Sequence, residues 1–115
     1  MIIIDQNTVS EVATYTEPIT SQDGSPLADL AYTYVEYHVG TNPPVLGPHV
    51  PATKPSGGGN ITTTVIFNAP AGVQTTVIAD VKAVDLNGNT SSASNSVTSV
   101  IDRVAPAAPT GFTLA

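Results

Sequence analysis

Apolar and polar residues alternate along several short runs of this chain, which is the two-residue period of a β-strand with one buried face. The clearest run covers residues 31–39. One face of this run carries Thr33, Val35, Tyr37 and Val39, and the other carries Tyr32, Tyr34, Glu36 and His38. We assign the first face to the core, because the second face holds the charged group and the imidazole.

Comparable patterns predict further strands, and turn-forming residues separate them. No segment shows the 3.6-residue period of an amphipathic helix. The pattern therefore predicts an all-β fold, and short strands with regularly spaced turns favour a β-sandwich. The further strands are expected around residues 2–4, 8–16, 61–67, 76–84 and 95–101.

Residues 40–60 interrupt this pattern with five prolines and five glycines. Proline removes a backbone donor from a sheet, and glycine loses much conformational entropy when it is ordered. We therefore expect a long surface loop with one short edge strand at most, and a flexible tip at Gly57-Gly58-Gly59. Loops of about 20 residues are uncommon in compact domains and are often functional or mobile.

Composition and charge narrow the range of functions. The chain has 115 residues, enough for one domain with little interior space for a ligand cavity. Its net charge is −6, and Lys54, Lys82 and Arg103 are its only basic side chains apart from histidine. Because nucleic acids and anionic membranes are bound by clusters of Lys and Arg, we expect neither as a partner. No run approaches the roughly 20 apolar residues of a membrane helix.

Residues suited to catalysis do not converge in this sequence. His38 and His49 are the only histidines, and we interpret both as surface residues. There is no cysteine, and no Gly-x-Ser-x-Gly elbow for a serine triad. Residues 85–89 resemble the start of a calcium loop, but Thr90 and Ser96 stand where an EF-hand needs Gly and Glu, so a hairpin turn is expected. We predict no enzymatic activity, no cofactor and no metal.

Three motifs resemble a known family: DGSPLADLAYTYVEY (23–37), AVDLNGNTSSAS (83–94) and APAAPTGFTL (105–114). They are similar to the loop into the third strand, the last hairpin and the start of a following repeat in fibronectin type III domains of the bacterial and phage kind. The resemblance implies an immunoglobulin-like sandwich of about seven strands over residues 1–101. Two large anchors of such domains are missing, since Thr14 or Tyr15 stands in place of a tryptophan and Val77 in place of a tyrosine. Both a divergent member and a broader immunoglobulin-like relative remain open.

Residues 102–115 are expected to form an extended, proline-rich arm that resembles the start of a following repeat. Pro106 and Pro109 favour an extended backbone. Phe112 and Leu114 alternate with polar or small residues and have no place in a sandwich that is already closed at Ile101. An extended strand of this kind can add to the edge of another sheet. The arm is therefore a candidate docking element, and the alternative is a linker cut inside a longer tandem array.

Tyr32 and Tyr34 form a second candidate contact site. If the face assignment is right, the two rings lie side by side on an exposed sheet face, where tyrosine is a favoured interface residue. The alternatives are that the 40–60 loop covers them, or that the faces are reversed.

Together these features favour a structural or interaction protein over an enzyme. No secretory signal is evident, whereas fibronectin-like modules of bacteria usually act outside the cell. A tailed-phage virion subunit reconciles the two, because it assembles in the host cytoplasm. We expect capsid decoration or a tail-associated role, with the major capsid protein, a tail protein or a second copy as partner, and weak contact with host-surface glycans. The alternative is a spacer or carbohydrate-associated module of a secreted or cell-surface bacterial protein.

Overall fold

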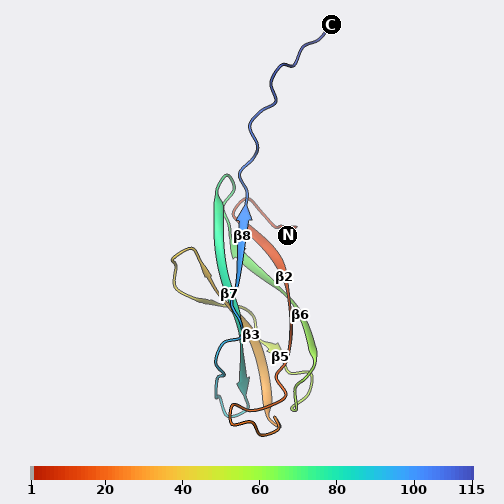
Figure 1. The fold of residues 1–115 in the computed structure, drawn as a ribbon, viewed down its shortest axis with the longest axis vertical. Helices are drawn as coiled ribbons and strands as arrows, with labels where there is room; N and C mark the ends of the chain where they lie inside the picture. The colour runs from red at the N-terminus through yellow and green to blue at the C-terminus, as the bar shows by residue number, and fades with distance from the viewer. Residues whose placement is uncertain (1) are drawn as a thin grey trace.

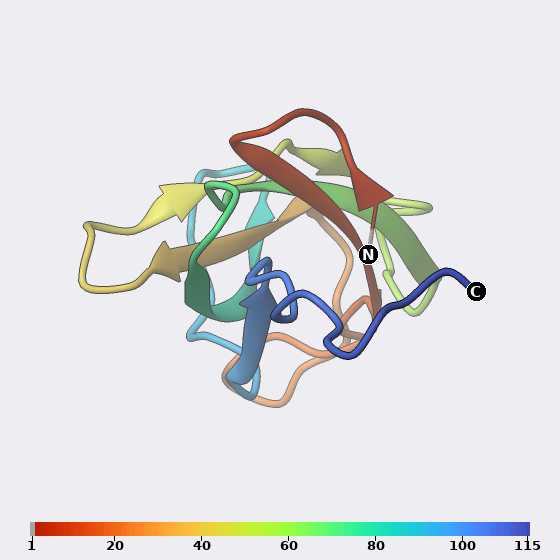
Figure 2. The ribbon, with the colours of Figure 1, turned by 90° about the horizontal axis from the view of Figure 1, so that it is seen from above.

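Two antiparallel sheets pack face to face in the computed structural model, which describes residues 2–115 (Figure 1, Figure 2). The smaller sheet has the order β1-β2-β6, with strands Ile2–Ile3, Thr8–Thr16 and Asn60–Asn68. The larger sheet has the order β4-β3-β7-β8, and β5 also pairs with β3. Its strands are β3 (Leu30–Val39), β4 (Val45–Leu46), β5 (Val50–Pro51), β7 (Gln74–Asp85) and β8 (Val97–Asp102). The predicted all-β class and β-sandwich architecture are confirmed.

The core lies between the sheets and uses the predicted inward faces. Val35 and Tyr37 of β3 share one buried cluster with Val65 and Phe67 of β6. The rings of Tyr37 and Phe67 meet edge to face with centroids 4.8 Å apart, and the Tyr37 hydroxyl donates to the Ile66 carbonyl at 3.0 Å. This geometry adds directional contacts to the apolar burial. The other members of the cluster are Val9, Ala69, Val77 and Ile101.

Tyr15 of β2 links the two sheets through a polar contact. Its ring packs against the core, and its hydroxyl is hydrogen-bonded to the buried Thr33 Oγ1 of β3 at 2.7 Å. Burial raises the pKa of the Tyr15 phenol, so the neutral hydroxyl persists at physiological pH. The bond satisfies two polar groups that would otherwise be costly to bury.

The proline- and glycine-rich segment 40–60 is more ordered than predicted. It contains two short strands, β4 and β5, both paired with β3. Gly57 is buried with φ +69°, and a Cβ at this position would overlap the carbonyl oxygen of Pro18. A Cβ at Gly59 would likewise overlap Thr53. The prediction of a flexible tip is therefore wrong at Gly57 and Gly59. Without a Cβ, Gly57 packs against the backbone of Pro18, and Gly59 packs against the side chains of Thr53 and Glu17.

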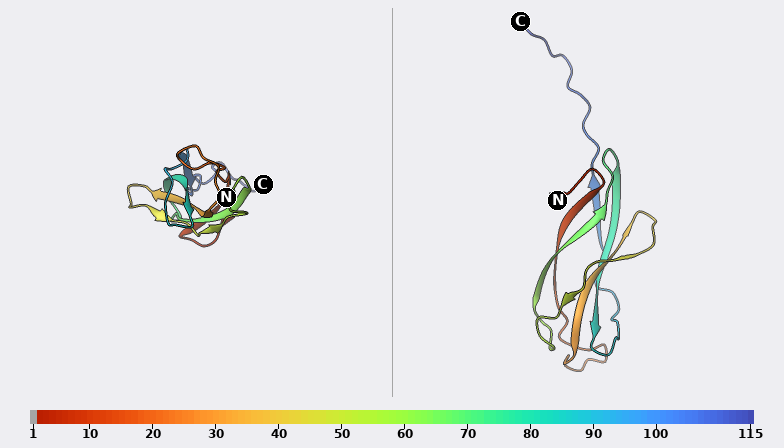
Figure 3. Two further views of the ribbon diagram at one scale, coloured as in Figure 1. Left: turned by 90° about the horizontal axis from the view of Figure 1, so that it is seen from below. Right: turned by 180° about the vertical axis from the view of Figure 1, so that it is seen from behind.

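The C-terminal segment leaves the sandwich along its long axis (Figure 1, Figure 3). The molecule measures 74 × 28 × 21 Å along its principal axes, and this segment accounts for much of the length. No helix among residues 2–115 is long and apolar enough to span a membrane.

Candidate functional site: the C-terminal arm and an open seam

Arg103 fastens the end of β8 to the sandwich and sets the root of the arm. Its guanidinium donates to the carbonyl oxygens of Gln6 (3.0 Å), Asp5 (3.2 Å) and Ala69. Its backbone N–H donates to the Val73 carbonyl at 3.2 Å. Asp102, which the sequence placed in the arm, is the last residue of β8. From here on, the arm means residues 104–115.

The arm itself is fully solvated. Val104 donates its N–H to Asp102 Oδ1 at 2.9 Å, and residues 105–115 make no hydrogen bond within residues 2–115. Phe112 and Leu114 are 82% and 84% exposed, more than any other large apolar side chains in the described chain. Pro106 and Pro109 are exposed as well. All four predicted arm residues therefore lie outside the sandwich, and their docking role stays a prediction.

The structure does not present Tyr32 and Tyr34 as an exposed pair. Pairing of β5 with Tyr32 and Thr33 brings the ring of His49 onto Tyr32, with centroids 4.0 Å apart and planes 11° from parallel. Tyr34 is only 8% exposed, and its ring lies 5.9 Å from that of His49. The expectation of an exposed pair is wrong for Tyr34, and the alternative of a covering 40–60 loop is correct.

The tyrosines and the arm are not parts of one site. Tyr32 pairs with Val84 near one end of β7, and Asp102 pairs with Gln74 at the other end. Ten residues of an extended strand span about 33 Å. A partner that engages the arm root does not reach the tyrosines without covering most of the sandwich.

Glu17 is a buried carboxylate that sequence reasoning missed. It is 2% exposed and accepts hydrogen bonds from the backbone N–H groups of Thr53 and Gly59, both at 2.9 Å, and from the Thr53 hydroxyl at 2.5 Å. Burial alone would raise the pKa of Glu17, but these donors and the charge of Lys54 outweigh it and hold the pKa below its usual range. A carboxylate so fully bonded is suited to fixing the loop rather than to acid–base chemistry.

The Asp85–Asn89 segment forms the expected hairpin turn. Asp85 Oδ1 accepts from the backbone N–H groups of Asn87 and Asn89, both at 2.9 Å. Gly88 adopts φ +83°, whereas Asn87 does not share the left-handed conformation. Among residues 2–115 there is no group of three or more His, Cys, Asp or Glu side chains placed to hold a metal ion.

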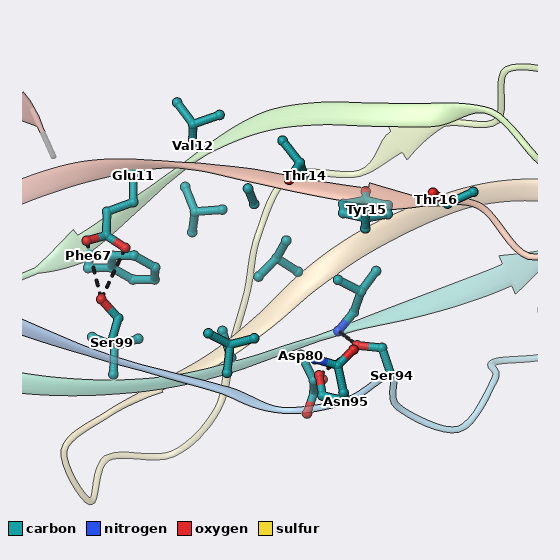
Figure 4. A pocket seen from close by; sticks show the side chains of 17 residues that line it. Glu11, Val12, Thr14, Tyr15, Thr16, Phe67, Asp80, Ser94, Asn95 and Ser99 are labelled. Carbon is teal, nitrogen blue, oxygen red and sulfur yellow. Dashed lines mark hydrogen bonds between the residues drawn. The ribbon is translucent and has the colours of Figure 1, made fainter.

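A groove, which we call the open seam, separates β2 of one sheet from β7 and β8 of the other (Figure 4). It has a volume of about 490 Å³ and lies open to solvent along the edge of the sandwich. Its interior is mainly apolar, whereas Glu11 and Ser99 face each other at one end with Oγ to carboxylate distances of 3.3 Å. The apolar side chains that line it are Val12, Ala13, Tyr15, Val35, Val65, Phe67, Val77, Ala79, Val81 and Val97.

The seam lies open along the part of β2 that β1 does not pair with. Asp5 Oδ1 accepts the backbone N–H groups of Asn7 (2.7 Å) and Thr8 (2.8 Å) in the Asx turn that joins β1 to β2. β1 pairs only with Val9 and Ser10 of β2, next to this turn. The rest of this β2 edge, residues 11–16, has no strand beside it within residues 2–115. The far edge of β8 is also unpaired in the described chain.

The chain matches no protein family model, no curated protein and no solved structure.

Proposed function

We propose that this protein is a non-enzymatic assembly module, an immunoglobulin-like domain of the fibronectin type III kind that docks on a neighbouring protein through its arm. The strand order supports the finer fold. In that fold the first, second and fifth strands form one sheet, and the third, sixth and seventh form the other. β1, β2 and β6 fit the first set, and β3, β7 and β8 fit the second, with β4 as an added edge strand.

One observation carries the docking proposal: two large apolar side chains are held out in solvent on a firmly anchored segment. Phe112 and Leu114 are more than four-fifths exposed, while Arg103 fixes the root of the arm with three side-chain hydrogen bonds. Exposed apolar residues on an extended strand are the feature that strand-addition interfaces use. A neighbour with an open sheet edge would bury both side chains.

The setting we propose is the virion of a tailed phage, with the domain displayed outward as a capsid-decorating or tail-associated subunit. The resemblance of residues 23–37, 83–94 and 105–114 to the bacterial and phage modules supports this setting. A major capsid or tail protein would then receive the arm, and host-surface glycans would be weak outer contacts. The second candidate is a spacer in a secreted bacterial protein, which the likeness of residues 105–114 to the start of a repeat favours.

Binding of the full chain to purified phage particles tests the proposal. Phe112→Ala is expected to cost about 2–4 kcal/mol of binding, the range of a buried aromatic anchor. Leu86→Ala is the matched control, because Leu86 is 70% exposed on the Asp85–Asn89 hairpin, away from the arm. Equal binding of the two variants would contradict a docking role for the arm.

A further inference from the structure

The open seam and the arm are complementary, and we infer that the seam receives the arm of a second copy of this chain as an added β-strand. The inference rests on the proposed docking role of the arm and names its partner. Strand addition needs a free sheet edge, an apolar groove beside it and an extended donor. All three are present in this molecule.

The free edge lies on β2. Thr8 directs its carbonyl toward the β1 side, where it accepts from Ile4 at 3.3 Å. In an antiparallel strand, alternate residues direct both backbone groups to the same side. Val12 and Thr14 therefore direct their N–H and C=O groups to the side that β1 does not reach. A donor strand placed there pairs with the part of β2 that lies beyond Ile2, the first residue of β1.

The groove is suited to apolar side chains that alternate along a strand. Ala13 and Tyr15 of β2 and Ala79 and Val81 of β7 line the seam, and all four are only partly buried. These are core side chains that lack a cover on one side. A donor on the β2 edge presents every second side chain to this gap and covers them.

The arm has the composition of such a donor. Phe112 and Leu114 stand two residues apart, so an extended strand directs both to one face and Thr113 to the other. The arm carries no charged side chain, so it adds no charge to the mainly apolar interior of a groove that Glu11 and Asp80 also line. Burial of Phe112 and Leu114 removes the two most exposed large apolar side chains of the described chain from water.

The geometry favours the arm of another copy over the molecule's own arm. The arm continues away from the sandwich beyond β8 (Figure 3), whereas the seam lies beside β8, where Val97 and Ser99 line it. Pro106 and Pro109 favour an extended backbone at the residues before them, and the first glycine of the arm is Gly111. From Val104 to Phe112 an extended arm spans about 25 Å. This reach places Phe112 beyond its own domain.

An arm in the seam of the next copy is a head-to-tail contact. Each copy then offers one free arm and one free seam, so the contact builds open chains or closes into a ring. The same contact leaves the Asp85–Asn89 hairpin at the opposite end of β7 uncovered.

The first test is the mass of the full chain in solution as a function of concentration. We expect self-association with a dissociation constant of about 1–100 μM, the range of small transient interfaces. The full chain carrying Phe112→Asp and Leu114→Asp is expected to bind at least 30-fold more weakly (about 2 kcal/mol or more). Leu86→Asp, on the exposed hairpin, is expected to associate like the unaltered chain. A monomer at every concentration up to about 1 mM would overturn the inference.

The second test probes the seam itself. Thr14 lies opposite Thr62 of β6 but directs its own backbone groups away from β6, so Thr14→Pro removes an N–H of the free edge, while Thr14→Val keeps it. The first variant should abolish self-association, and the second should retain it. A peptide of residues 104–115, added to the Phe112→Asp, Leu114→Asp chain, should bind and shift the amide resonances of Val12 and Thr14. If the peptide shifts no seam residue while the full chain still binds phage particles through Phe112, the inference fails and the proposed function stands.

Discussion

Two segments that both contain proline, glycine and threonine behave in opposite ways. Neither residues 53–59 nor the arm forms a strand. The first is closed around the buried carboxylate of Glu17, whereas the second makes no hydrogen bond beyond Val104 within residues 2–115. Composition alone does not separate an ordered loop from a solvated arm. The difference is whether a distant residue satisfies the backbone groups of the segment.

The largest expected effect is a loss of stability when residues 53–59 lose the carboxylate of Glu17. Glu17→Ala removes the acceptor of three hydrogen bonds and leaves the part-buried donors of Thr53 and Gly59 without their partner. We expect a loss of about 2–5 kcal/mol in the free energy of unfolding, measured by urea denaturation. Glu36→Ala is the control, because its ion pair with Lys82 (2.9 Å) lies at the surface and should contribute less than about 1 kcal/mol. Similar losses in the two variants would show that Glu17 does not hold the loop.

A pair of glycines gives the next comparison. Gly57 and Gly111 both have positive φ, +69° and +74°, but only Gly57 has neighbours that a Cβ would overlap. Gly57→Ala is expected to cost about 1–3 kcal/mol of stability, whereas Gly111→Ala should change it by less than about 0.5 kcal/mol. Thermal unfolding of both variants measures the difference. A comparable loss from Gly111→Ala would mean that the arm packs on its own domain.

The smallest expected effect is the pH dependence of the loop closure. The folded-state pKa of Glu17 is lowered from its ordinary value of 4.5. The contribution of Glu17 to the free energy of unfolding is therefore present above pH 4.5 and is lost as the pH falls through the lowered pKa of the folded state. The unaltered chain should therefore lose stability on acidification more steeply than Glu17→Gln. Urea midpoints measured between about pH 6 and pH 2.5 test this. Parallel curves for the two chains would contradict the ionised state of the buried carboxylate.

The strands could be predicted because their signal is local. Alternation within residues 31–39 and 61–67 places Val35, Tyr37, Val65 and Phe67 in the core, as the structure confirms. The coverage of Tyr34 and the packing of Gly57 could not be predicted in the same way. The coverage of Tyr34 depends on the pairing of Tyr32 with Pro51. The packing of the glycines depends on Glu17, which accepts a hydrogen bond from Gly59, 42 residues away in sequence.

The candidate site also has one feature that a local sequence signal predicts and one that depends on residues distant in sequence. The exposure of Phe112 and Leu114 could be predicted, because both residues follow the last strand of the sandwich. The open seam depends on an absent pairing: the alternating pattern of residues 8–16 marks a strand but does not show that β1 covers only two of its residues. The Asp5-Gln6-Asn7 turn marks the junction of β1 and β2, since Asp and Asn favour turns, but it does not show how far β1 extends along β2.

The most direct test of arm docking in the seam is a cross-link between copies, because the chain has no native cysteine. Thr14→Cys places a thiol on the free β2 edge, and Thr113→Cys places one on the arm. Mixing the two single variants under mild oxidation should give a mixed Thr14→Cys/Thr113→Cys dimer faster than either homodimer, because paired strands bring thiols within disulfide range. The pair of Thr113→Cys with Leu86→Cys should cross-link only at the background rate. Equal rates for the two mixtures would contradict docking of the arm in the seam of a second copy.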